Sequence, residues 1–208
     1  MPAPLPSRTD RTRDAARRPV SVHHGDMSDS LAPGFIIAVP HLADLNFRHS
    51  VVLLLEQNAD GALGVVVNHE SPLLLKELCR DHSIQYSGDP GKRVRAGGPV
   101  QPEQGLVLYD DRLDDHEGRQ VHAGLRVSAS QGTLNRLCGS PGGRFQCFAG
   151  YAGWGPGQLD DEIHQNAWLN VPADDELVFD DLLDTKWERS IAKLGIDLSL
   201  LSGDAGHA

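Results

Sequence analysis

The segment Gly150–Leu159 combines four glycines, a proline and two large aromatic residues, and an acidic run follows it directly. A glycine-rich loop that leads into a helix can cradle an anion on its free backbone amides. Here Asp160, Asp161 and Glu162 fall in the first turn of the expected helix, where they already complement the helix dipole and would repel a phosphate. The pattern therefore favours a tight structural corner with an acidic helix start over an anion site.

Polar side chains on this expected helix are the first candidates for chemistry. Gln158, Glu162 and Asn166 are spaced four residues apart, so they share one helix face. Glu162 is the candidate general acid or base. The alternative is an ordinary solvated stripe.

A second group of candidates flanks two apolar runs. Arg48 and Ser50 precede one run and Asn68 ends the next, with the turn signal Asn58–Gly61 between the runs. This order predicts a hairpin that brings Arg48 and Asn68 to one end of a sheet. Arg48 can then clamp a carboxylate or phosphate, or it can bond loop carbonyls with its five donors.

Aromatic residues and a glycine pair complete the candidate surface. Trp154 and Trp168 can line a ligand groove or fill the core. Gly97-Gly98 is too short for a phosphate loop and predicts a turn with positive φ. The candidate binding surface comprises Arg48, Ser50, Asn68, Gly97, Gly98, Tyr151, Gly153, Trp154, Gln158, Glu162, Asn166 and Trp168.

Metal, cofactor and nucleophile signatures are not found in the sequence. Cys79 and His82 have Cys-x₂-His spacing, but Cys138 and Cys147 provide no second close pair. Neither a GxSxG elbow nor a phosphate-loop pattern occurs. We therefore expect no metal and no cofactor.

The composition restricts the partner class and the compartment. The formal net charge of −10 disfavours direct nucleic-acid binding, which depends on Lys and Arg. No apolar run approaches the roughly 20 residues of a membrane helix, and no signal peptide is recognisable. The three cysteines form no CxxC pair. We expect a cytoplasmic protein with free thiols.

The chain divides into a tail and one domain. Residues 1–30 are rich in Pro and Arg, which predicts a disordered tail, and translation starting at Met27 would remove most of it. Residues 31–208 mix strands and helices without regular βαβ alternation, which predicts a single α+β domain. Helices are expected over 73–79, 130–137, 158–166 and 184–194.

Motifs spread over this domain resemble the YqgE/AlgH family of bacterial proteins. They include Phe35–Pro40, Phe47–Val52, Asp60–Asn68, Gly97–Val100, Gly150–Trp154, Asn166–Leu169, Lys186-Trp187 and Leu194–Asp197. The resemblance implies a coiled and bifurcated, mostly antiparallel sheet with flanking helices. It implies no known reaction, although some members carry the label of transcriptional regulator.

Three positions depart from the family pattern. Gln57 stands where the family usually has a histidine, Tyr109 stands where it often has another, and His69 stands where a lysine is typical. A mechanism that depends on those family residues does not transfer to this chain.

Two functions remain open at this point. The first is a non-catalytic regulatory or interaction protein, and the second is a hydrolase of a small anionic substrate with Glu162 as base and Arg48 as clamp. The partner is accordingly an unknown protein or a small anionic ligand. Direct DNA binding is the weakest hypothesis because of the acidic composition.

Overall fold

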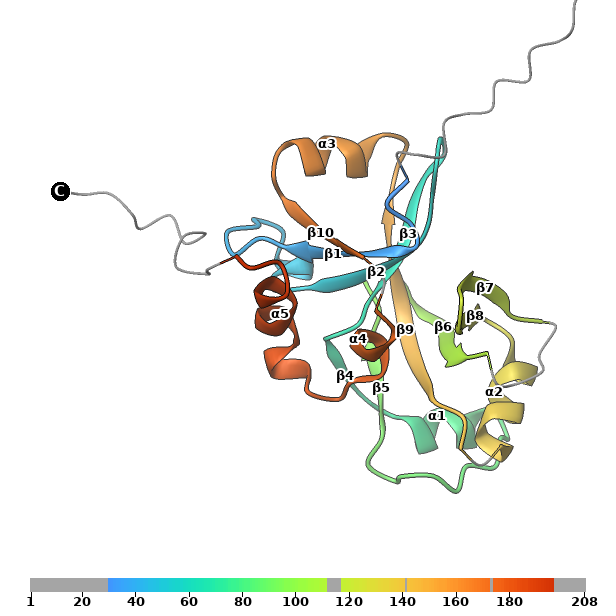
Figure 1. Ribbon diagram of the computed structural model, residues 1–208. Coiled ribbons are helices and arrows are strands. Elements are labelled where there is room, and N and C mark those ends of the chain that lie inside the picture. The colour runs from blue at the N-terminus through green and yellow to red at the C-terminus, as the bar shows by residue number, and fades with distance from the viewer. Residues whose placement is uncertain (1–29, 112–116, 141, 173, 197–208) are drawn as a thin grey trace, which may run out of the picture.

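The structure is a computed structural model that describes residues 30–111, 117–140, 142–172 and 174–196. The expected tail up to residue 29, with the internal start at Met27, lies outside these ranges, as do residues 197–208. The described chain is α+β, as predicted, with a curled sheet and surrounding helices (Figure 1). None of the helices in these ranges is long and apolar enough to cross a membrane.

Four antiparallel strands form the first part of the sheet, in the order β10–β1–β2–β3. They are β1 (Gly34–Ala38), β2 (Val51–Asn58), β3 (Gly61–Val66) and β10 (Trp168–Pro172). Every residue of β1 is buried, because separate apolar clusters cover its two faces. Phe35 and Ile37 belong to one cluster, and Ile36 and Ala38 belong to the other, as the two-residue period of a strand requires. The predicted hairpin is confirmed by the pairing of β2 with β3.

Six further strands form the second part of the sheet, centred on β9. They are β4 (Glu70–Leu74), β5 (Arg93–Ala96), β6 (Val100–Asp110), β7 (Arg119–His122), β8 (Leu125–Ser128) and β9 (Phe145–Trp154). β5 pairs with β9 in parallel, whereas the other described pairs are antiparallel. The residue pattern did not indicate β4, because Glu70 and Pro72 interrupt its apolar positions.

The sheet bifurcates at the middle of β9, where β3 and β5 share one edge of that strand. Gly97 connects them: its carbonyl accepts from the Val66 amide at 2.8 Å, and its own amide donates to the Ala149 carbonyl at 2.8 Å. Gly98 has a φ of +151°, and a Cβ there would lie 2.2 Å from the carbonyl carbon of Tyr151. The predicted positive-φ turn is confirmed, and the fork requires glycine because two backbones meet there.

Five α-helices surround the sheet in the described ranges. They are α1 (Leu75–Asp81), α2 (Gln131–Gly139), α3 (Gln158–His164), α4 (Asp175–Phe179) and α5 (Leu183–Ala192). In Figure 1, α1 and α2 lie beside the second part of the sheet, and α3 and α5 lie beside the first part. Ser130 caps α2, as predicted, by accepting hydrogen bonds from the backbone amides of Gly132 and Thr133.

Candidate functional site

The carboxylate of Glu162, on α3, accepts hydrogen bonds from three side chains. Oε2 accepts from Trp154 Nε1 at 3.0 Å and from Trp168 Nε1 at 2.8 Å, and Oε1 accepts from Gln158 Nε2 at 2.8 Å. Both indoles are buried, so each N–H needs an acceptor inside the protein. Glu162 supplies that acceptor and thereby joins α3 to β9 and β10.

A few local hydrogen bonds hold the start of α3, which has no side-chain cap. Gly157 precedes the helix in the left-handed conformation, with a φ of +71°. The Gly155 amide donates to Gln158 Oε1 at 3.1 Å, and Gln57 Nε2 donates to Asp160 Oδ1 at 2.8 Å. With Asp160 and Asp161 in its first turn, this helix start has the character of the acid-capped corner that the sequence favours over an anion cradle.

An aromatic cluster connects this corner to the segment before β2. Phe47 stacks on Trp154 with the ring centroids 5.9 Å apart, and it meets Trp168 edge-on at 5.7 Å. It belongs to the 3₁₀ turn η1 (Leu45–Phe47), which Asp44 caps by accepting from the Asn46 amide at 2.8 Å. The segment 44–50 is thus anchored on the tryptophans that hold Glu162.

Asn68 anchors the other end of this segment. Its Oδ1 accepts from the Val51 amide at 2.8 Å, and its Nδ2 donates to the His49 carbonyl at 2.8 Å. The expected proximity of Asn68 to the start of β2 is therefore observed. His49 adopts a φ of +53°, and its ring lies 4.3 Å from that of Trp187, which in turn donates to the Ala38 carbonyl at 2.7 Å.

Ser50 and His69 form a polar pair beneath the same segment. Ser50 Oγ lies 3.4 Å from His69 Nε2. Burial lowers the pKa of His69 and the proximity of His49 adds to this, while a hydrogen bond to the Arg48 backbone acts in the opposite direction. A serine beside a neutral imidazole resembles the start of a nucleophile system. However, Ser50 has no exposed surface, so its hydroxyl cannot meet a substrate in this conformation.

Five residues of the anchored segment are exposed: Asp44, Leu45, Asn46, Arg48 and His49. Leu45 is 80% exposed. In the part of the chain that the structure describes, the Arg48 side chain makes no hydrogen bond or ion pair. We call Leu45, Arg48 and His49 the loop face.

The structure brings six of the predicted site residues together through Phe47 and its segment: Ser50, Asn68, Trp154, Gln158, Glu162 and Trp168. Arg48 lies on the same segment, but its side chain bonds none of them. The others have different surroundings. Gly97, Gly98 and Tyr151 build the fork of the sheet, and Gly153 pairs with Leu63 in the ladder between β3 and β9.

The expectation that Asn166 shares a helix face with Glu162 is wrong. α3 ends at His164, and Asn166 adopts a φ of +57° beyond it, with its amide donating to the Ile163 carbonyl at 2.9 Å. Asparagine tolerates this left-handed conformation, so it redirects the chain into β10.

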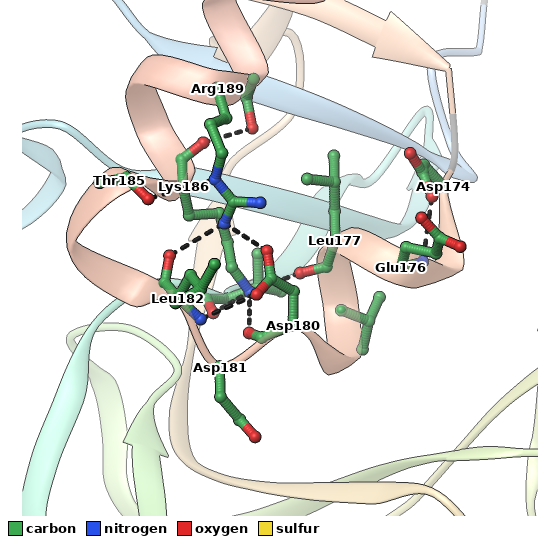
Figure 2. A network of polar contacts seen from close by, with 12 residues as sticks. Asp174, Glu176, Leu177, Asp180, Asp181, Leu182, Thr185, Lys186 and Arg189 are labelled. Carbon is green, nitrogen blue, oxygen red and sulfur yellow. Dashed lines mark hydrogen bonds and ion pairs between the residues drawn. The ribbon is translucent and has the colours of Figure 1, made fainter.

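A buried cationic network was not anticipated from the sequence (Figure 2). Lys186, on α5, is fully buried, and its Nζ donates to the carbonyls of Leu177 at 2.6 Å and Asp180 at 2.7 Å. Arg95 lies beside it and donates to the Val67 carbonyl at 3.1 Å, an acceptor that it shares with Lys186. Burial first, and Arg95 second, lower the Lys186 pKa to about 7. In the sequence, only the family motif Lys186-Trp187 drew attention to this part of the chain.

No group of three or more His, Cys, Asp or Glu side chains within the described ranges could hold a metal ion. The sulfurs of Cys79 and Cys138 lie 3.7 Å apart, and burial raises the pKa of both thiols, that of Cys138 to about 12. Protonated thiols are poor metal ligands and poor nucleophiles.

Comparison with known proteins gives consistent matches over most of the chain. The family model described as AlgH-like matches residues 35–199. A UPF0301 protein of Thioalkalivibrio sulfidiphilus is 40% identical over 183 residues, which cover 87% of this chain and 98% of that protein. A UPF0301 protein of Cupriavidus metallidurans is 41% identical over 182 residues, which cover 86% of this chain and 96% of that protein.

Two solved structures share the fold. The solution structure of the AlgH protein from Pseudomonas aeruginosa has a TM-score of 0.69 and 36% identity, and the match covers 88% of this chain and 98% of that chain. A crystal structure of a Corynebacterium diphtheriae protein has a TM-score of 0.70 at 19% identity, and the match covers 85% and 94% of the two chains.

Proposed function

The chain belongs to the AlgH-like family, and from this premise we propose that it is a non-catalytic regulatory protein that binds a partner protein through the loop face. The proposal concerns the role of Leu45, Arg48 and His49, which form an apolar and basic surface on an otherwise acidic chain.

The observation that supports this function is the way the segment 44–50 is held. Phe47 packs on two buried tryptophans at one end, and Asn68 bonds both sides of Ser50 at the other. The exposed side chains therefore stand on a segment that is already ordered. A preordered loop loses little conformational entropy when it binds a partner, which favours a recognition role.

The hydrolase alternative has less support. Both oxygens of Glu162 are engaged by side chains, two of them buried indoles. Taking up a proton as a general base would turn this carboxylate into a weaker acceptor for the two buried indole N–H groups that depend on Oε2. A regulatory effect would be indirect, through the partner protein, because the net charge of −10 disfavours contact with DNA.

The experiment is a quantitative pull-down from a lysate with wild type, Leu45→Asp and Arg48→Glu, using Leu182→Asp as the matched control. Leu182 is also a large exposed apolar residue, 66% exposed, and it precedes α5. We expect Leu45→Asp and Arg48→Glu to lose the same partner by about tenfold or more, and Leu182→Asp to retain it. Identical partner recoveries for all four proteins would contradict the proposal.

A further inference from the structure

A cavity of about 250 Å³ lies between α1, α2 and the second part of the sheet. We propose that this cavity binds an uncharged apolar small molecule with the size of an indole or naphthalene ring system. A space of about 150 Å³ is enough for a benzene ring, so this larger cavity, which opens to solvent on one side, has room for a fused bicyclic ring. The site is separate from the loop face, and the proposal goes beyond the proposed function.

Small residues on one face of the sheet create this space. Residues of a strand alternate between its faces, so Gly105 and Val107 of β6 share one face. Their partners on β9 are Ala149 and Cys147, and all four line the cavity. Glycine, alanine and cysteine fill little volume beneath two helices, which leaves room for a ligand.

Gly105 is exposed and lies at the mouth of the cavity. A Cβ at Gly105 would meet no heavy atom within 4 Å, whereas a Cβ at Gly97 or Gly98 would lie 2.3 or 2.2 Å from the neighbouring backbone. Glycine inside a strand weakens the strand. At the fork, close backbone approach explains the glycine, whereas at the exposed Gly105 the missing side chain leaves the mouth of the cavity open.

The walls of the cavity are apolar and held in place. Leu78 of α1 and Leu134 of α2 belong to the same apolar cluster as the buried Val107 of β6 and Cys147 of β9, and all four line the cavity. Gln131 Nε2, on α2, donates to the His82 carbonyl at the end of α1 at 2.8 Å, which fixes one helix against the other. The ligand therefore meets a preformed site, as most small-molecule pockets are.

The chemistry of the lining sets the ligand class. Charged or polar side chains such as His82, Glu103 and Gln131 are exposed and lie at the rim. The hydroxyl of Ser128 is already donated to Thr133 Oγ1 at 3.1 Å. Since the interior carries no charge and Glu103 disfavours an anion at the rim, the ligand body is uncharged and apolar.

The test is a fluorescence titration with N-phenyl-1-naphthylamine, an uncharged apolar probe. Wild type should give a saturable, one-to-one enhancement, and Gly105→Leu should weaken it by about tenfold or more because the new side chain obstructs the mouth of the cavity. Gly139→Leu is the matched control, since a Cβ there also meets nothing within 4 Å but Gly139 does not line the cavity. Absence of saturable binding to wild type, or equal binding by Gly105→Leu, would overturn the proposal.

A second measurement on wild type does not depend on the folding of a variant. Methyl NMR spectra recorded during titration with indole should show shifts at Leu78, Leu134 and Val107. Shifts confined to Leu45 and its neighbours, or no shifts at all, would overturn the proposal equally.

Discussion

The titration of Lys186 gives a quantitative test of the buried network that holds α5 to the sheet. Burial and the adjacent Arg95 lower its pKa from 10.5 to about 7 in the folded protein. Between those values the unfolded chain keeps a proton that the folded protein has released. The free energy of unfolding must therefore rise with pH through this interval, and the cost of the buried charge is fully present below it.

The magnitude follows from the size of the shift. One pKa unit corresponds to about 1.36 kcal/mol, so the full shift corresponds to about 5 kcal/mol. Between about pH 7 and about pH 8.5 we expect an increase of about 1–2 kcal/mol, because folded Lys186 is already partly deprotonated at the start of this range. The range lies above the titration of His69, whose pKa is lowered from 6.5, and below that of the cysteines, whose pKa values are raised from 9.0.

The assay is urea unfolding at several pH values for wild type, Lys186→Met and Lys76→Met. Lys76 is an exposed residue of α1 and serves as the control for the loss of one lysine. Wild type and Lys76→Met should gain about 1–2 kcal/mol across the range, and Lys186→Met should stay nearly flat. Burial also lowers the pKa of Lys92, but that contribution is common to all three proteins. An equal rise in Lys186→Met would refute the assignment of a suppressed pKa to Lys186.

Three other predictions concern the cluster, the fork and the partner class. Glu162→Gln should lower the free energy of unfolding by about 1–3 kcal/mol, because Trp154 and Trp168 then share a weaker acceptor, while Asp161→Asn on the exposed face should change it by less than about 0.5 kcal/mol. Gly98→Ala should lower the free energy of unfolding by more than about 2 kcal/mol, because its Cβ would collide with the backbone of Tyr151. Gly105→Ala is the control and should have no such effect. Equal urea midpoints for the two variants would contradict this prediction. In gel-retardation assays, the protein should not retard duplex DNA at low salt, and a band that disappears steeply with added salt would contradict this.

The network also explains how the loop face depends on distant residues. Lys186 bonds carbonyls of the α4 segment and of the chain after β3, which fixes α5 in place. The next residue, Trp187, packs on His49 of the loop face and donates to Ala38 of β1. Destabilising this helix should therefore disorder the loop face before the sheet.

Local patterns were enough to predict several elements. The run Phe35–Val39 and the turn at Asn58–Gly61 identified β1 and the hairpin of β2 with β3, because apolar runs and turn residues act over a few positions. The need for glycine at Gly98 was also visible, although the reason, contact with Tyr151 on β9, was not.

Contacts distant in sequence could not be predicted in the same way. Lys186 Nζ donates to the carbonyl of Val67, which lies 119 residues earlier, and nothing near either residue signals that pairing. Glu162 had the spacing of a polar helix stripe, but its acceptor role depends on two tryptophans from different strands. In the sequence, Phe47 stood out only as part of the motif Phe47–Val52. Its packing against Trp154 and Trp168 is visible only in the structure.

The most direct test of the loop face as a binding surface is site-specific photo-crosslinking in living cells. A photoreactive phenylalanine analogue is placed at Leu45 in one strain and at Leu182 in another, since both side chains are exposed. The account predicts a discrete crosslinked species of higher mass from position 45 that is missing from position 182. No crosslink at position 45, or the same species from both positions, would contradict it.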